Sequence, residues 1–191
     1  MKELFIVLSS ILIFCGYLIY EWSIIVGKTK PHRTTRFVLF LITALGAASL
    51  LAQKSDAAFW LLAICAIHGL VVFLLSLKYG VGGWAKTDII CLLIALFGIV
   101  IWKMTGSPAL ALYTAISADF VGMIPSLIKT YRLPHTEYWL SYIFDIGASV
   151  FTLLAIRLWQ PSEYSYPLYI IIINIFMIFL IFRPKFIHKF S

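Results

Sequence analysis

Two aspartates stand inside apolar stretches of this chain, where a carboxylate can do chemistry. Asp119 lies within residues 109–128 and Asp145 within residues 138–156, two stretches rich in Leu, Ile and Ala. A charge near the centre of a bilayer costs about 2.5 to 3.5 kcal/mol on insertion scales, so such acids usually face a bundle interior or a wet cavity and have a function. We therefore predict that both acids bind a substrate or carry a proton. The alternative is a structural hydrogen bond from a neutral acid to a neighbouring hydroxyl.

A proline follows the first of these acids in the same stretch. Pro125 lies six residues after Asp119, or about 9 Å along a helix axis at about 1.5 Å per residue. This spacing carries Asp119 away from the helix end and toward the middle of the bilayer. A proline inside a helix removes one backbone hydrogen bond and provides a place to bend. We predict a hinge at Pro125, although many membrane helices contain such a proline for packing alone.

Two neutral polar side chains lie in other apolar stretches. His68 falls in residues 57–77 and Asn174 in residues 168–182. We name both as candidates for the same substrate or proton site. A buried His or Asn also forms interhelical hydrogen bonds, and this structural role is the alternative.

The composition defines the elements that must hold these residues. With 62% hydrophobic and 12% charged residues and a mean hydropathy of +1.00, the chain lacks the polar surface of a water-soluble domain. Because one helical crossing needs about 20 mostly apolar residues, we predict an all-α membrane protein with seven transmembrane helices. The fourth and seventh stretches are short, and we expect them to extend into their flanks. The seven stretches are residues 4–26, 37–52, 57–77, 89–102, 109–128, 138–156 and 168–182.

The basic residues predict the orientation. Eleven of the 15 fall in the loops after the first, third and fifth stretches and in the C-terminal tail. The positive-inside rule then places the N-terminus outside and the C-terminus in the cytosol. We interpret these charges, and the net charge of +7, as topology signals rather than a nucleic-acid surface. The eleven residues are Lys28, Lys30, Arg33, Arg36, Lys78, Lys86, Lys129, Arg132, Arg183, Lys185 and Lys189.

Two basic loops are related by an internal repeat. At a constant offset of 101 residues, positions 28–52 match positions 129–153 at seven residues, among them the pairs Lys28-Thr29 and Lys129-Thr130. Both copies start on the same side, so an even number of crossings separates them, and the repeats are parallel. We predict a three-plus-one-plus-three plan. Its parts are a first three-helix bundle (residues 1–84), a linker helix (85–106) and a second three-helix bundle with a cytosolic tail (107–191).

The segment GMIPSLIKTYRLPHTEYWL, residues 122–140, resembles the PQ-loop and SWEET (MtN3/saliva) transporter superfamily. In that motif a Pro-Gln pair leads into a short cytosolic loop that ends in Ser or Thr. Pro125 matches the proline, Ser126 stands where the motif has Gln, and Thr136 lies near its hydroxyl. SWEETs carry hinge prolines in four helices and this chain in one of them, so it looks like a divergent bacterial seven-helix member. The resemblance also implies asparagines around the substrate in the third and seventh helices, where Asn174 matches the seventh and His68 is the nearest polar candidate in the third.

The resemblance implies a transporter of a small polar solute, such as a sugar, a vitamin or an amino-acid-like molecule. The vitamin transporters of the PnuC type share a related seven-helix plan. Transport would proceed by alternating access between the two three-helix bundles, either facilitative or coupled to protons, in a multi-pass protein of the bacterial cytoplasmic membrane. The rival interpretation is a membrane-embedded enzyme or a signalling or scaffold protein on the same bundle.

The expected partners and cofactors follow from the same interpretation. We expect a small-molecule substrate and membrane lipids as partners, allow for a homo-oligomer, and expect no nucleic acid. We expect no enzyme activity, cofactor or metal, because no Ser-His-Asp spacing is present and Cys15, Cys65 and Cys91 lack metal-ligand spacing.

Overall fold

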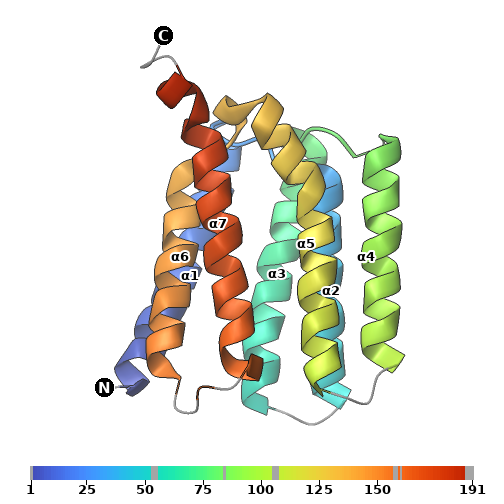
Figure 1. Ribbon diagram of the computed structural model, residues 1–191, viewed down its shortest axis with the longest axis vertical. Helices are drawn as coiled ribbons and strands as arrows, with labels where there is room; N and C mark the ends of the chain where they lie inside the picture. Colours follow the sequence, from blue (N-terminus) through green and yellow to red (C-terminus); the bar gives the residue numbers. More distant parts are fainter. Residues whose placement is uncertain are drawn as a thin grey trace. The chain divides into compact units, whose positions relative to one another are not determined.

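The structure is a computed structural model that describes residues 2–52, 56–83, 85–104, 108–156, 159 and 161–187. These residues form seven α-helices and one short 3₁₀ helix, without named strands (Figure 1). The prediction of an all-α chain is thereby confirmed for the described part. The helices are α1 (Lys2–Ile25), α2 (Arg33–Ala52), α3 (Asp56–Tyr79), α4 (Lys86–Met104), α5 (Pro108–Arg132), η1 (Pro134–Thr136), α6 (Trp139–Ala155) and α7 (Pro161–Ile187).

Proline and glycine set several helix boundaries. Helices α5 and α7 begin at Pro108 and Pro161. The N–H of a first helical residue has no partner within the helix, so a proline there loses no hydrogen bond. Helix α1 ends before Gly27, whose φ of 76° suits the left-handed conformation at a helix C-terminus. The fourth and seventh helices extend beyond their apolar stretches, as expected from the sequence.

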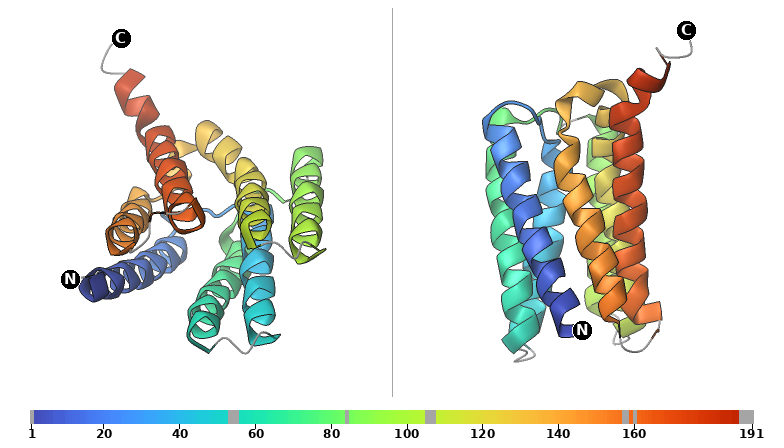
Figure 2. Two further views of the ribbon diagram at one scale, coloured as in Figure 1. Left: turned by 60° about the horizontal axis from the view of Figure 1, so that its bottom comes forward. Right: turned by 90° about the vertical axis from the view of Figure 1, so that its left-hand side faces the viewer.

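The chain divides into two compact units. Unit 1 comprises residues Met1–Thr29 and Lys129–Ser191, and unit 2 comprises Lys30–Ile128. In unit 1, α1 packs along α6, and α6 packs along α7 (Figure 2). In unit 2, α2 packs along α3 and also contacts α4.

Each unit mixes helices from both predicted repeats. Unit 1 joins the first helix of the first repeat, α1, to the second and third helices of the second repeat, α6 and α7. Unit 2 joins α5 to α2, where Val38 and Ala118 form a small buried core with Ile42 and Leu92. Relative to the predicted repeats, the two units therefore have their first helices exchanged. A grouping by contacts does not test a division by repeated sequence, so the domains 1–84, 85–106 and 107–191 stay a prediction.

Contacts at the helix ends show which loops share an end of each unit. In unit 1, Lys2 Nζ donates to the carbonyl oxygen of Ile156 at 2.6 Å, whereas the Tyr138 N–H donates to Thr29 Oγ1 at the other end. In unit 2, Arg33 donates to the carbonyl oxygens of Ser76 and Gly82. Four basic residues do not belong to the eleven on the predicted cytosolic side, and two of these four, Lys54 and Arg157, lie outside the described residues.

The described side chains show an inverted polarity. Buried polar side chains are at least as numerous as buried apolar ones, whereas large apolar side chains stand exposed along α1, α4 and α7. Examples are Ile11, Phe14 and Leu18 on α1, Leu93 and Phe97 on α4, and Ile172, Phe176 and Phe179 on α7.

By length and composition, two helices in the described part could cross a membrane. They span Lys2–Ile25 and Glu163–Pro184. The seven-span topology stays a prediction.

Close packing of α5 on α2 yields a first prediction. A Cβ atom at Gly122 would lie 2.6 Å from Val38 Cγ1, and Val38 is 1% exposed. Gly122→Ala should therefore destabilise the protein by about 1 to 3 kcal/mol, despite the better helix propensity of alanine. Thermal unfolding in detergent measures this loss.

The matched control is Gly147→Ala, because among the described residues its new Cβ would meet a terminal methyl of Leu12 at 3.3 Å, the end of a flexible side chain. Combining Gly122→Ala with Val38→Ala should cost less than the sum of the two single changes. Strict additivity would contradict the packing argument.

Candidate functional site

The structure places Asp145 near the middle of α6, facing α1. It is the seventh of the 17 residues of this helix and is half-buried. A Cβ atom at Gly16 of α1 would lie 3.2 Å from Asp145 Oδ1. The missing side chain at Gly16 therefore lets the carboxylate approach the α1 backbone, inside the packed interface of unit 1.

Asp119 and Pro125 both lie in α5. Asp119 is the twelfth of the 25 residues of this helix and is half-buried, whereas Pro125 is buried. The helix continues through Pro125 to Arg132. The expected mid-helix position of Asp119 agrees with these bounds.

The two neutral candidates differ in their surroundings. His68 is half-buried near the middle of α3. Asn174 is 6% exposed in α7, and its Nδ2 donates to the carbonyl oxygen of Ile170 at 2.8 Å, one turn earlier in the same helix. This bond satisfies one amide N–H of Asn174 within its own helix, whereas the structural alternative is a hydrogen bond between helices.

The five predicted residues divide between the two units. Asp145 and Asn174 belong to unit 1, and Asp119, His68 and Pro125 belong to unit 2. Their roles as substrate site, proton site and hinge stay predictions.

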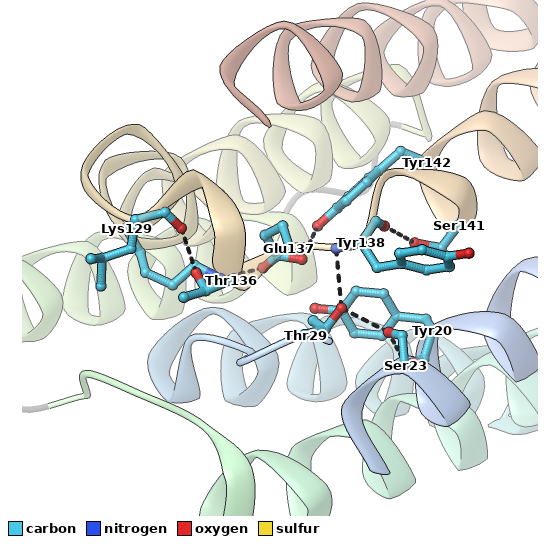
Figure 3. Close-up of polar contacts among 10 residues, drawn as sticks. Tyr20, Ser23, Thr29, Lys129, Thr136, Glu137, Tyr138, Ser141 and Tyr142 are labelled. Carbon is cyan, nitrogen blue, oxygen red and sulfur yellow. Dashed lines mark hydrogen bonds and ion pairs between the residues drawn. The ribbon is translucent and has the colours of Figure 1, made fainter. Parts of the chain in front are cut away.

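A buried polar cluster that the sequence analysis missed lies in unit 1 (Figure 3). Lys129 Nζ forms a hydrogen-bonded ion pair with Glu137 Oε1, and the two side chains are 5% and 0% exposed. The Tyr142 hydroxyl donates to the other carboxylate oxygen of Glu137 at 2.7 Å. The ring of Tyr142 meets the buried Tyr20 of α1 edge-on, with centroids 6.3 Å apart. The cluster thus links the end of α5, the start of α6 and α1.

A second set of bonds holds the start of α6. Tyr138, the residue before α6, has no capping bond from its own side chain, but its N–H donates to Thr29 Oγ1 at 3.1 Å. The Ser23 hydroxyl oxygen lies 2.7 Å from Thr29 Oγ1 and 2.7 Å from the carbonyl oxygen of Tyr20. A helix N-terminus leaves N–H groups without intrahelical partners, and here the loop after α1 supplies an acceptor for one N–H at that end.

The two repeat-related lysines have different environments. Lys28 is exposed, with Nζ 4.4 Å from the ring centroid of Trp22 and 5.1 Å from that of Tyr138. Lys129 is buried and ion-paired. Lys129 therefore has a structural role in addition to the topology signal that we predict for the basic loops, because a charge withdrawn from water needs a partner. The sequence signal was present in Glu137, an acid only eight residues after Lys129.

Unit 2 has its own polar cluster near the start of α4. Asp88 Oδ2 accepts hydrogen bonds from the N–H groups of Gly83 at 2.9 Å and Ala85 at 3.2 Å. Its Oδ1 lies 3.6 Å from His32 Nε2. A carboxylate in the first turn that bonds back to preceding N–H groups is a helix-capping arrangement, so this cluster fixes the loop before α4.

Comparison with known proteins gives no relative: no family model matches the chain, and no curated protein or solved structure is similar to it. The PQ-loop and SWEET resemblance therefore stays a prediction from the motif. In the described part of the chain, His, Cys, Asp and Glu side chains form no group of three or more that could hold a metal ion.

The ion pair yields the second prediction. Lys129→Met or Glu137→Gln alone should cost about 3 to 5 kcal/mol, because each removes the partner of a buried group and Lys129→Met leaves an unpaired buried charge. The double variant should recover a large part of this loss. Thermal unfolding of the four proteins in detergent gives the coupling between the two positions.

The repeat-related lysine serves as the control. Lys28→Met removes an exposed charge from two aromatic rings and should cost about 1 kcal/mol or less. If the double variant loses as much unfolding free energy as the two single variants together, Lys129 and Glu137 are not coupled.

Proposed function

We propose that this protein is a membrane transporter of a small polar solute, such as a sugar, a vitamin or an amino-acid-like molecule. Seven helices cross the bilayer, with the N-terminus outside and the C-terminus in the cytosol. Solute passes by alternating access, either facilitated or coupled to protons.

The observation that carries this proposal is the position of two carboxylates. Asp119 and Asp145 lie near the middle of α5 and α6. If these helices span the membrane, both carboxylates lie near the centre of the bilayer. Hydrocarbon offers a carboxylate no hydrogen-bond donor, so acids at this depth serve substrate, ion or proton pathways far more often than packing.

The surface polarity supports the membrane part of the proposal. Large exposed apolar side chains follow α1, α4 and α7, whereas ordinary soluble proteins bury most such residues. Hydrocarbon chains cover these faces without the free-energy cost that water would impose. The polar side chains then face other helices rather than lipid.

The two predicted three-helix bundles, residues 1–84 and 107–191, are the bodies that move in this proposal. Pro125 lies inside α5, the first helix of the second bundle. The backbone hydrogen bond that this proline removes lets α5 bend. The sequence contains no phosphate-binding glycine-rich loop, so the driving force is the solute gradient or an ion gradient.

The substrate class is found first with a ligand screen. Sugars, amino acids, vitamins and nucleosides are tested for stabilisation of the detergent-purified protein, since a ligand that binds only the folded state raises its unfolding temperature. Uptake of the stabilising solute into proteoliposomes then measures transport.

The third prediction concerns the two acids. Asp119→Asn and Asp145→Asn should each reduce uptake by about tenfold or more, equivalent to ~1.4 kcal/mol on the transport barrier, because the amide cannot exchange a proton or attract a cation. Glu163→Gln is the control, since Glu163 is exposed in the first turn of α7. Full uptake by both aspartate variants would refute the proposed site.

The fourth prediction concerns the hinge. Pro125→Ala should slow uptake about tenfold while leaving ligand stabilisation of the protein unchanged, because restoring the hydrogen bond stiffens α5 without altering the binding groups. Pro167→Ala, which changes a proline in the early part of α7, should leave uptake near the wild-type rate. Equal uptake by wild type and Pro125→Ala would assign Pro125 to packing.

A further inference from the structure

One end of unit 1 carries a continuous row of aromatic rings. Trp22 of α1 meets Tyr138 at a centroid distance of 6.1 Å, Tyr138 meets Trp139 of α6 at 6.3 Å, and Trp139 meets Phe182 of α7 at 6.0 Å. The row therefore joins all three helices of the unit. Aromatic rings at helix ends are typical of the level of lipid headgroups.

Cations flank this row. Lys28 Nζ lies over the rings of Trp22 and Tyr138, and the Arg183 guanidinium lies 3.8 Å from the ring centroid of Tyr131. Arg132 is also exposed at this end. Two acids belong to this end: Glu137 is buried and paired with Lys129, and Glu21 immediately precedes Trp22 in α1. The charge that this end presents is therefore mainly positive.

Arg183 uses few of its donors. Its Nη2 donates to the carbonyl oxygen of Tyr131 at 2.9 Å, in an exposed bond. Its Nε and Nη1 are buried and have no hydrogen-bond partner among the described residues. A guanidinium has five N–H donors that match the oxygens of a phosphate, so the second N–H of the exposed Nη2 is the donor that an anion can reach.

An apolar groove lies at the same end of unit 1, where α7 contacts η1. Its volume is about 380 Å³, and two of its lining residues, Phe182 and Pro184, directly flank Arg183 in the chain. The groove is lined by Pro134, His135, Glu137, Trp139, Ile181, Phe182 and Pro184. It lies toward the end of α7, the helix whose exposed side chains Ile172, Phe176 and Phe179 form an apolar face.

We propose that this groove and its basic rim bind one anionic phospholipid, with an acyl chain against Ile181 and Phe182 and the phosphate against Arg183 and His135. The apolar acyl chain of such a lipid matches the apolar groove, and its negative phosphate matches the basic rim. Basic residues at a membrane surface attract anionic headgroups, and the aromatic row keeps the groove at headgroup level. This inference rests on the membrane embedding proposed above but not on transport.

The test compares lipids on the full-length protein in neutral detergent. Phosphatidylglycerol should raise the unfolding temperature by about 3 °C or more, whereas phosphatidylcholine and inorganic phosphate should change it little. Arg183→Gln and His135→Gln should each lose most of the shift. Lys78→Gln should keep it, because Lys78 is an exposed lysine over the ring of Tyr79 in unit 2.

A second measurement separates the loss of lipid binding from a loss of folding in the variants. Native mass spectrometry counts the phosphatidylglycerol molecules that remain bound to each protein, and wild type should keep one more than His135→Gln, in which the exposed His135 is replaced. An equal shift with phosphatidylcholine, or with phosphate alone, would overturn the assignment to an anionic lipid. Unchanged lipid retention in both variants would overturn the site, whatever the uptake assay shows.

Discussion

The ion pair between Lys129 and Glu137 is the contact on which the end of unit 1 depends. An ammonium and a carboxylate withdrawn from water each cost several kcal/mol unless they meet one another and other hydrogen-bond partners. Glu137 satisfies this condition on both oxygens, with Lys129 on one and Tyr142 on the other. This ion pair therefore holds the end of α5 to the start of α6. Removing either side chain alone leaves the other buried without its partner, which is strongly destabilising. The same end carries the Thr29 bond to Tyr138, which orders the loop after α1 against α6.

The two halves of the chain share a pattern but use it differently. Lys28 and Lys129 occupy equivalent positions in the repeat, yet one lies over aromatic rings at the surface and the other is buried against a carboxylate. The first helices are also exchanged between the units, with α1 on α6 and α5 on α2. An exchange of this kind makes each unit depend on residues from both halves.

Inverted polarity connects the fold to the proposed function. Where the outer faces are apolar, polar groups gain nothing by facing outward, and they gather instead at helix contacts and in loops. Most of the buried polar groups described above have a structural partner: Asn174 bonds to its own helix, Asp88 caps the start of α4, and Glu137 is paired. Asp119 and Asp145 stand out because they are ionisable and also lie in mid-helix rather than near a loop. This difference is why the proposal places the solute or the proton at these two acids.

The sequence by itself determined the helical class, the seven apolar stretches and the mid-helix positions of the two aspartates, because these depend on composition and on spacing along one chain. It also predicted that the fourth and seventh helices would extend. It did not predict that α1 packs on α6, or that Lys129 and Glu137 are buried together. Only the tertiary structure decided these points. Which helix covers which face depends on close approach at residues such as Gly16 and Gly122, and a loop charge becomes buried only when folding brings other elements over it.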